Sequence, residues 1–197
     1  FCSIYYEPII TTDLHISIDE AQDISVAEIN MIKNVNNQSA VYNLYGDVEQ
    51  VVNYKGISKW EDISFIYNFY YLKENFRNTN QITIFSNEKC NTNMQAIGLE
   101  GIDVKTINNF DIFENTIKLL SKANERVAII INKTDAKYNN VRRFINQNNI
   151  INISIFSVIQ SKGLEFEKVF VFSKSMTQNE RYVAFTRALK ELTIVDI

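Results

Sequence analysis

Two adjacent carboxylates, Asp19 and Glu20, directly follow the apolar segment His15–Ile18 and open the string DEAQD. An apolar run of this length is typical of a buried strand, and open α/β sheets bind ligands at the carboxyl ends of their strands. In nucleotide hydrolases one carboxylate at such a place holds Mg²⁺ and a second polarises the attacking water. The pair therefore predicts a centre that hydrolyses phosphate bonds, although an acidic pair alone is also common in solvated turns.

A second polar group has the sequence GDVEQ and runs from Gly46 to Gln50, at the end of the predicted strand Val41–Tyr45. A glycine here lets the backbone bend close to a phosphate. The amide of a glutamine can orient a water or sense a terminal phosphate. Taken alone, GDxxQ could be a plain turn. Its position about 25 residues after DEAQD indicates a functional motif.

Three further polar segments follow in order along the chain. They read LKENFRNT over 72–79, SVIQSKGLEF over 157–166 and YVAFTRA over 182–188. Together with DEAQD and GDVEQ, these segments resemble the motifs of superfamily 1 helicases of the UvrD/Rep type, in the order of that family. The resemblance covers most of the chain. It implies part of an ATP-dependent DNA helicase or translocase that moves on single-stranded DNA, with an α/β fold of RecA-like parallel sheets flanked by helices.

The resemblance implies roles for four residues at the first motifs and at the aromatic position of LKENFRNT. Asp19 would coordinate Mg²⁺, and Glu20, beside the metal, would act as the catalytic base. Gln50 would couple the γ-phosphate of ATP to the DNA site. Phe76 would stack on the adenine, since stacking on an aromatic face requires no particular base.

The resemblance also assigns residues of the later motifs to the nucleotide. Arg77 would contact the γ-phosphate and Glu165 the ribose, while Lys162 and Gly163 would lie at the domain interface and follow the nucleic-acid backbone. Arg187 would be the arginine finger, because a planar and always charged donor group suits the charge that spreads over the transferred phosphate. Read singly, each arginine is more typical of a surface ion pair, and the motifs are what favour the functional interpretation.

One motif of the family is missing. A P-loop requires GxxxxGK, and no Gly-Lys dipeptide occurs in this sequence. We therefore expect residues 1–70 to be the C-terminal part of the first RecA-like, ATP-binding domain. Residues 71–197 are expected to be the second RecA-like helicase domain. Such a fragment is expected not to hydrolyse ATP by itself.

The interval between Arg77 and Ser157 is about 80 residues, which leaves no room for the large extra subdomain of UvrD and Rep. The chain thus resembles the compact members, including the HelD-like branch, whose members use ATP to remodel RNA polymerase. Two alternatives remain beside the helicase, namely a factor that acts on RNA polymerase and a regulatory fragment without ATPase activity. A GxxxxGK motif encoded upstream of Phe1 would exclude the second alternative.

The expected DNA contacts have weaker support than the ATP contacts. Ile159 stands where UvrD-like proteins often carry histidine. The aromatic that stacks on a DNA base after GDxxQ would be Tyr54 or Trp60, neither at a matching distance. Arg142 and Arg143, side by side on a predicted helix, are interpreted as a solvated face, with a patch for a nucleic-acid backbone as the alternative.

Short apolar runs alternate with helical patterns along the chain, which predicts an α/β fold with a mostly parallel sheet. Arg126–Ile131 is apolar without interruption, as expected of a strand covered on both faces. The other strands are expected at 15–18, 41–45, 69–72, 102–107, 153–157, 169–172 and 192–195. Helices are expected at 25–35, from about 78, around 113–120 and 138–145, and at 179–188.

The composition excludes several classes of protein. With 46% apolar residues, 5 Gly and 1 Pro, the chain is neither disordered nor collagen-like. Two cysteines make no disulfide framework, and no apolar run is long enough for a membrane helix, so we expect a cytoplasmic protein without a membrane partner. Residues 1–70 carry 10 acidic and 3 basic residues, whereas 71–197 carry 13 acidic and 17 basic residues. This split favours two parts with different tasks.

Overall fold

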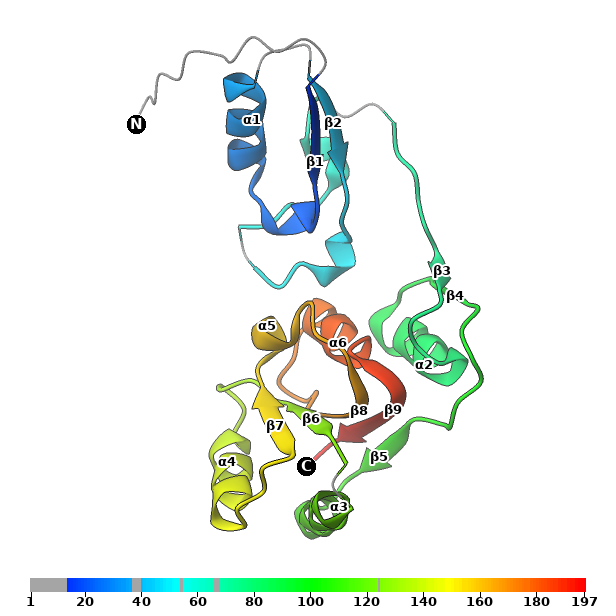
Figure 1. Cartoon of the computed structure of the whole chain (residues 1–197), viewed down its shortest axis with the longest axis vertical. Helices are drawn as coiled ribbons and strands as arrows, with labels where there is room; N and C mark the ends of the chain where they lie inside the picture. The colour runs from blue at the N-terminus through cyan, green and yellow to red at the C-terminus, as the bar shows by residue number, and fades with distance from the viewer. Residues whose placement is uncertain (1–13, 37–39, 54, 66–67, 124) are drawn as a thin grey trace. The chain divides into compact units, whose positions relative to one another are not determined.

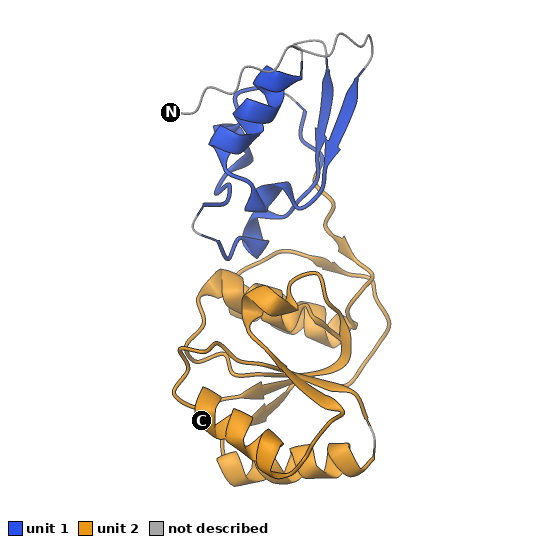
Figure 2. Cartoon of the chain, turned by 60° about the vertical axis from the view of Figure 1, so that its left-hand side comes forward, with its two compact units in different colours: residues 1–70 blue, residues 71–197 orange. Residues whose placement is uncertain are grey.

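The structure is a computed structural model that describes residues 14–36, 40–53, 55–65, 68–123 and 125–197. The chain divides into two compact units, Phe1–Tyr70 and Tyr71–Ile197, which Figure 2 shows in different colours. Tyr54, considered above as a stacking aromatic, and Cys2, one of the two cysteines, lie outside the described residues. Among the residues described, no helix is long and apolar enough to cross a membrane.

The first unit is built on a strand–helix–strand element (Figure 1). Strands β1 (His15–Ile18) and β2 (Val41–Leu44) pair in parallel, with His15 opposite Val41 and Ile18 opposite Leu44. Parallel neighbours require a long crossover, which helix α1 (Val26–Val35) supplies. Three short 3₁₀ turns complete the unit, and they are η1 (Ala21–Asp23), η2 (Val48–Gln50) and η3 (Trp60–Asp62).

Helix α1 begins at a capping box, in which the Ser25 side chain accepts from the Glu28 N–H and the Glu28 side chain accepts from the Ser25 N–H. Its inner face buries Ile29 against Ile57 and Ile63. Trp60 packs against the same cluster. Its ring therefore belongs to the small core of this unit, a placement that does not favour the predicted stacking on a DNA base.

The second unit contains a five-stranded sheet in which every neighbouring pair is parallel, in the order β5-β9-β8-β6-β7. This sheet, with helices on its faces, confirms the predicted α/β fold with a RecA-like parallel sheet flanked by helices. The strands are β5 (Lys105–Ile107), β6 (Val127–Ile130), β7 (Ile153–Phe156), β8 (Phe166–Val171) and β9 (Ala188–Val195).

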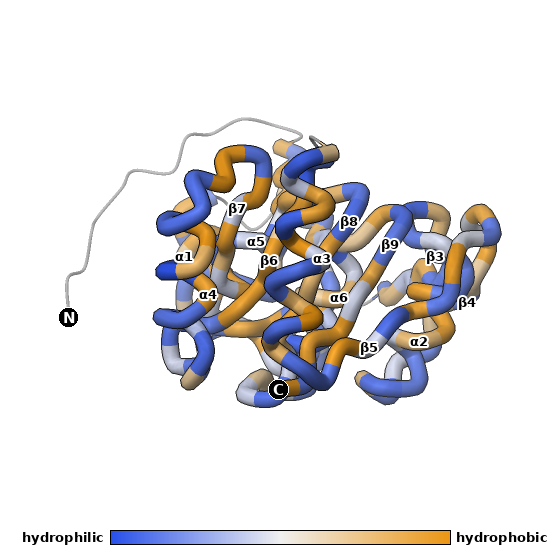
Figure 3. The backbone as a smooth tube through the Cα atoms, turned by 90° about the horizontal axis from the view of Figure 1, so that it is seen from below, coloured by the Kyte–Doolittle hydropathy of each residue, from blue (hydrophilic) through white to orange (hydrophobic). Residues whose placement is uncertain are grey.

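Helices cover both faces of this sheet (Figures 1 and 2). Helices α3 (Phe110–Lys122) and α4 (Tyr138–Gln147) lie on one face, where Phe113 and Phe144 join the main core. The other face is covered by α2 (Asn80–Cys90), α5 (Val158–Ser161) and α6 (Gln178–Phe185). Every residue of β6 is buried, as predicted for a strand enclosed on both sides, and Figure 3 shows its apolar course.

One predicted strand is wrong. Residues 68–73, which include the apolar run 69–72, form no strand, and the first strand of this unit is the two-residue β3 (Glu74–Asn75), paired in parallel with β4 (Gln95–Ala96). The side chains of Tyr70 and Leu72 are 88% and 92% exposed. An apolar run indicates a strand only if a neighbour pairs with it, and no described strand lies alongside this one.

Candidate functional site

The two predicted carboxylates lie where β1 ends. Asp19 and Glu20 are both exposed, and the Glu20 N–H donates to Asp19 Oδ1 over 2.9 Å. Glu20 has φ 50° and ψ 35°, in the left-handed region. Residues other than glycine are uncommon there, and such strain clusters at functional sites. The backbone at the end of β1 thus turns sharply at the predicted catalytic base.

Gln22 connects the first motif to the second. Its side chain is fully buried, donates from Nε2 to Glu20 Oε2 over 2.6 Å and accepts at Oε1 from the Asp47 N–H over 3.1 Å. The carbonyl oxygen of Gln22 also accepts from the Ile57 N–H over 2.8 Å. No role was predicted for Gln22 from the sequence, and its position inside the DEAQD motif is the feature that could have pointed to one.

Gly46 is required by this link. A Cβ at Gly46 would lie 2.1 Å from Gln22 Oε1 and 3.1 Å from the ring of Trp60. From its sequence context, Gly46 was expected to let the backbone bend close to a phosphate. The structure gives another reason, which is the close approach of the buried Gln22 side chain to the backbone.

Gln50, the predicted γ-phosphate sensor, is held within its own turn. Its Nε2 donates to Asp47 Oδ2 over 3.0 Å, and Asp47 Oδ1 accepts from the Glu49 N–H over 3.0 Å. Asp47 therefore orients Gln50 and also caps η2. Through Gln22, this turn is joined to the carboxylate of Glu20.

The donor set at β1 fits Mg²⁺ bound together with phosphates. Among the described residues, no group of three or more His, Cys, Asp or Glu side chains could hold a metal on its own. Mg²⁺ usually takes one or two protein carboxylates and completes its shell with water and substrate phosphates. Asp19 and Glu20 are oxygen donors of that kind and number.

In the second unit, Arg77 lies between β3 and α2 and contacts a residue of another predicted motif. Its Nε lies 2.8 Å from Glu165 Oε1, and both side chains are about half exposed, at 51% and 42%. The structure thus pairs two predicted nucleotide contacts with one another, namely Arg77, expected at the γ-phosphate, and Glu165, expected at the ribose. Phe76 is 75% exposed, as a ring that stacks on a base would have to be.

Gly163 lies in the turn between α5 and β8. Its φ of +76° is in the region that favours glycine, and a Cβ built there would meet nothing within 4 Å. The backbone conformation, and not crowding, therefore explains the glycine. The same turn leads directly into Leu164 and Glu165.

Arg187 is 2% exposed and lies between α6 and β9. Its Nε donates to the Val183 carbonyl over 3.0 Å, Nη2 to Thr186 Oγ1 over 3.2 Å and Nη1 to the Leu164 carbonyl over 3.4 Å. The predicted arginine finger is thus directed toward oxygens of its own unit. A phosphate would have to replace some of these acceptors.

A hollow of about 810 Å³ is lined in part by Glu165 and Phe166, with Glu125 and Glu167. Arg126 and Lys168 also line it, so three carboxylates and two cations face this hollow.

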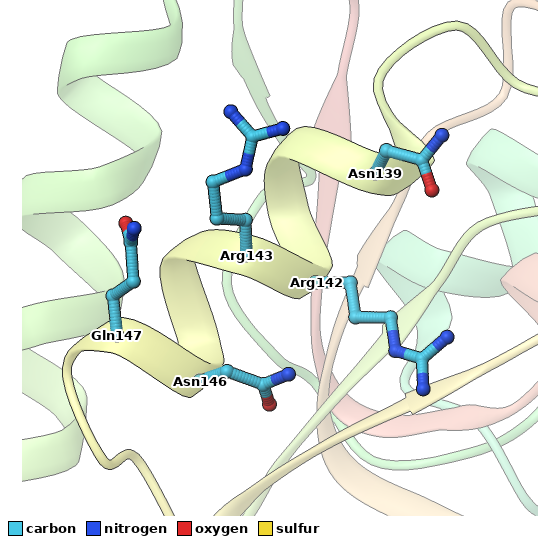
Figure 4. A pocket seen from close by; sticks show the side chains of 5 residues that line it. All are labelled: Asn139, Arg142, Arg143, Asn146 and Gln147. Atoms are coloured by element: carbon cyan, nitrogen blue, oxygen red, sulfur yellow. The ribbon is translucent and has the colours of Figure 1, made fainter.

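A second hollow, of about 390 Å³, follows one helix. It is lined by side chains of α4 that Figure 4 shows projecting from successive turns, namely Asn139, Arg142, Arg143, Asn146 and Gln147. All of these belong to a single helix face. The geometry fits the solvated face predicted for Arg142 and Arg143.

Comparisons with known proteins agree with the fold and with a superfamily 1 helicase family. The family model described as viral superfamily 1 RNA helicase core domain matches residues 11–196. No curated protein matches the chain. Among solved structures, the chain is similar to the C-terminal domain of a possible DNA helicase from Lactobacillus plantarum WCFS1, with 21% identity, a TM-score of 0.45, and coverage of 62% of this chain and 87% of that one.

Two structures of the PRRSV helicase are also similar. One has 13% identity and a TM-score of 0.60 over 91% of this chain and 34% of that one. The other, of PRRSV nsp10, has 11% identity and a TM-score of 0.35 over 91% of this chain and 35% of that one. The chain therefore spans about a third of the length of these two proteins, and at such identities the likeness concerns the fold.

Proposed function

Because the chain belongs to the viral superfamily 1 RNA helicase core domain family, we propose that it is the part of an ATP-dependent helicase or translocase that supplies catalytic carboxylates and phosphate-binding arginines. Superfamily 1 helicase membership is what the family match establishes. The kinship to UvrD and Rep, the ATP dependence and the nucleic-acid partner belong to the proposal, as does the activity of the whole protein.

The observation that carries the proposal is the convergence of predicted nucleotide contacts within unit 2. Arg77, Glu165 and Arg187 come from three separate motifs, yet they meet at the turn that follows α5. Two guanidinium groups and a carboxylate beside an exposed Phe76 form a set that could hold phosphate, ribose and base. A purely structural ion pair would not require the exposed aromatic ring.

In this proposal each unit contributes a different chemical task. Asp19 would bind Mg²⁺, which withdraws charge from the phosphates when bound, and Glu20 would take a proton from the attacking water. Arg77 and Arg187 would neutralise the charge that develops on the transferred phosphate. Gln22 would keep the Glu20 carboxylate in place. Hydrolysis of ATP would drive movement along a single strand, which the protein would hold through backbone contacts and base stacking.

The choice of polymer has support on both sides. The resemblance of the motifs to UvrD and Rep favours single-stranded DNA, whereas the name of the matching family favours RNA. Proteins bind single-stranded DNA and single-stranded RNA alike through backbone contacts and base stacking, so the same residues would serve for either polymer. We give DNA and RNA equal places in the test.

The test is the ATPase activity of the full-length product of the gene, measured without polymer and with single-stranded DNA or RNA of equal length. We expect stimulation by at least one of the two, and no hydrolysis by the 197-residue chain alone, which contains no GxxxxGK. Hydrolysis that neither polymer stimulates, but that RNA polymerase does, would replace the helicase by a HelD-like remodelling factor. Absence of any ATP hydrolysis would overturn the proposal.

A further inference from the structure

We propose that Asn78 is a positioning residue that fixes the backbone on both sides of Arg187 and couples it to Arg77. The inference rests on the proposed function, in which both arginines serve ATP. None of the sequence motifs assigned a task to Asn78. Asn78 belongs to the same predicted motif as Arg77, and the two carbonyls to which it donates belong to the motif of Arg187.

The contacts of Asn78 are specific to the residues that flank Arg187. Its Nδ2 donates to the Thr186 carbonyl over 3.0 Å and to the Ala188 carbonyl over 2.7 Å. Asn78 is 2% exposed, so water does not compete for these bonds. The carbonyl oxygen of Arg187 itself accepts from the Phe166 N–H over 3.0 Å. Three consecutive peptide carbonyls, from 186 to 188, are thus held, two of them by a single side chain.

Asn75 completes the link on the side of Arg77. Its Oδ1 accepts from the N–H groups of Arg77 and Asn78, over 3.0 and 3.1 Å, and its Nδ2 donates to Asn78 Oδ1 over 2.8 Å. Both N–H donors and the oxygen of Asn78 therefore have partners. The backbone at Arg77 and the backbone at Arg187 are joined through two amide side chains.

The chemistry explains why an asparagine is suited to this place. A primary amide carries two N–H donors on one nitrogen, so it can serve two carbonyls while its oxygen accepts a third bond. A hydroxyl has one donor, and a carboxylate would face two carbonyl oxygens with no donor at all. A buried network of this kind has value when every member is satisfied, as it is here.

This arrangement gives the two arginines a common support. Arg77 and Asn78 are consecutive residues of one loop. A phosphate that draws Arg77 away from Glu165 would therefore also shift Asn78. Asn78 would transmit that shift to the peptides around Arg187, whose guanidinium must leave the Leu164 carbonyl to reach the same phosphate. A 1 Å misplacement of a catalytic group can cost about 100-fold in rate.

The experiment compares Asn78→Ala with Asn152→Ala in the full-length protein. Asn152 is a matched control in the same unit, because its Nδ2 donates to the Glu125 carbonyl over 2.6 Å and its Oδ1 accepts from Ser121 over 3.2 Å, away from the motifs. We expect Asn78→Ala to lower kcat about 10- to 100-fold with a smaller change in KM for ATP. Asn152→Ala should leave both constants near the wild-type values.

A double-mutant cycle separates positioning from general destabilisation. If Asn78 acts through Arg187, Asn78→Ala should lower kcat in the wild-type background and have little further effect in an Arg187→Ala background. An equal factor in both backgrounds would overturn the proposal. Should Asn78→Ala fail to fold, Asn75→Asp serves instead, since it keeps the acceptor for Arg77 and removes the donor to Asn78 Oδ1.

A readout without ATP distinguishes this inference from the proposed function. Hydrogen–deuterium exchange of the Phe166 amide, which donates to the Arg187 carbonyl, should accelerate in Asn78→Ala and stay unchanged in Asn152→Ala. Accelerated exchange in a protein that hydrolyses no ATP would refute the helicase proposal while supporting the link. Unchanged exchange in Asn78→Ala would refute the link, whatever the activity.

Discussion

Arg77 and Arg187 contact adjacent residues of one turn, although they lie far apart in the sequence. Arg77 Nε pairs with the Glu165 carboxylate over 2.8 Å, and Arg187 Nη1 donates to the Leu164 carbonyl over 3.4 Å. The two guanidinium groups thus share a wall made by the segment that follows Gly163. In the proposed function, both guanidinium groups would reach the phosphates of ATP from this wall.

The first prediction concerns Arg187→Lys, which keeps the positive charge and removes the planar fork of donors. We expect kcat for ATP to fall about 10³-fold, because a lysine cannot contact two phosphate oxygens in the manner of an arginine finger. The measurement is steady-state ATPase activity with saturating polymer. Arg181→Lys is the matched control, since Arg181 also donates from Nε to a backbone carbonyl, that of Ser173, over 3.1 Å. Wild-type kcat in Arg187→Lys would contradict the arginine-finger role.

A second prediction concerns the ion pair between Arg77 and Glu165. Glu165→Gln should raise KM for ATP several-fold, since the ribose loses its carboxylate acceptor and Arg77 loses the group that orients it. The melting temperature should hardly change, because exposed ion pairs contribute at most about 1 kcal/mol. Glu167→Gln weakens a more exposed pair, with Lys190, and should change neither quantity. Equal KM values in the two variants would remove Glu165 from the nucleotide site.

The sequence was sufficient for several of the elements that carry the motifs, but not for all of them. The strand at 15–18 and the helix that starts after Ser25 were predicted from apolar spacing and are confirmed, as is the buried strand of β6. Such elements depend on local periodicity, which the sequence displays directly. The run at 69–72 has the same local signal and is not a strand, because pairing depends on a neighbour that the pattern does not specify.

The polar links of the site could not be predicted in the same way. Gln22 and Asn78 are buried amides whose partners come from other motifs. Amide side chains carry no periodic signal, and a hydrogen bond between distant segments depends on the completed fold. The inward direction of Arg187 was missed for the same reason, since a motif indicates a residue type and not the direction of its side chain.

A third prediction tests the link through Gln22. Gln22→Met keeps the length of the side chain but removes its hydrogen bonds to Glu20 and to the Asp47 N–H. We expect kcat to fall at least 10-fold, because the Glu20 carboxylate loses its fixed position. The free energy of unfolding should drop by roughly 1 kcal/mol, because the partly buried Asp47 N–H loses this hydrogen bond. The measurements are ATPase activity and denaturant unfolding.

Gln81 makes the same types of hydrogen bond as Gln22 and provides its control. Gln81 also bridges a carboxylate and a backbone N–H, donating to Glu100 Oε2 over 2.6 Å and accepting from Gly101 over 2.7 Å, at an exposed place in the second unit. Gln81→Met should leave kcat unchanged. If both variants lost activity to the same degree, the effect of Gln22→Met would reflect general destabilisation and not the catalytic base.

The last prediction concerns pH and the ion network on the second unit. Lys168 pairs with Glu125 and with Glu191, and its hydrogen bond with Glu125, followed by the contacts with Glu191, raises the Lys168 pKa above 10.5 despite partial burial. Because the pKa is higher in the folded state, the network stabilises this unit in full below about pH 10.5, and that contribution is lost as the pH rises through the folded value.

Lys168→Met should therefore lower the free energy of unfolding at pH 7 by a few tenths to about 1 kcal/mol, since solvent screens these partly exposed groups. The difference from the wild type, measured by urea unfolding between pH 7 and roughly pH 11, should shrink at the alkaline end. Lys190→Met removes the more exposed pair with Glu167 and should give a smaller difference at pH 7, and a Lys168→Met effect independent of pH would show that lost packing, not charge, is responsible.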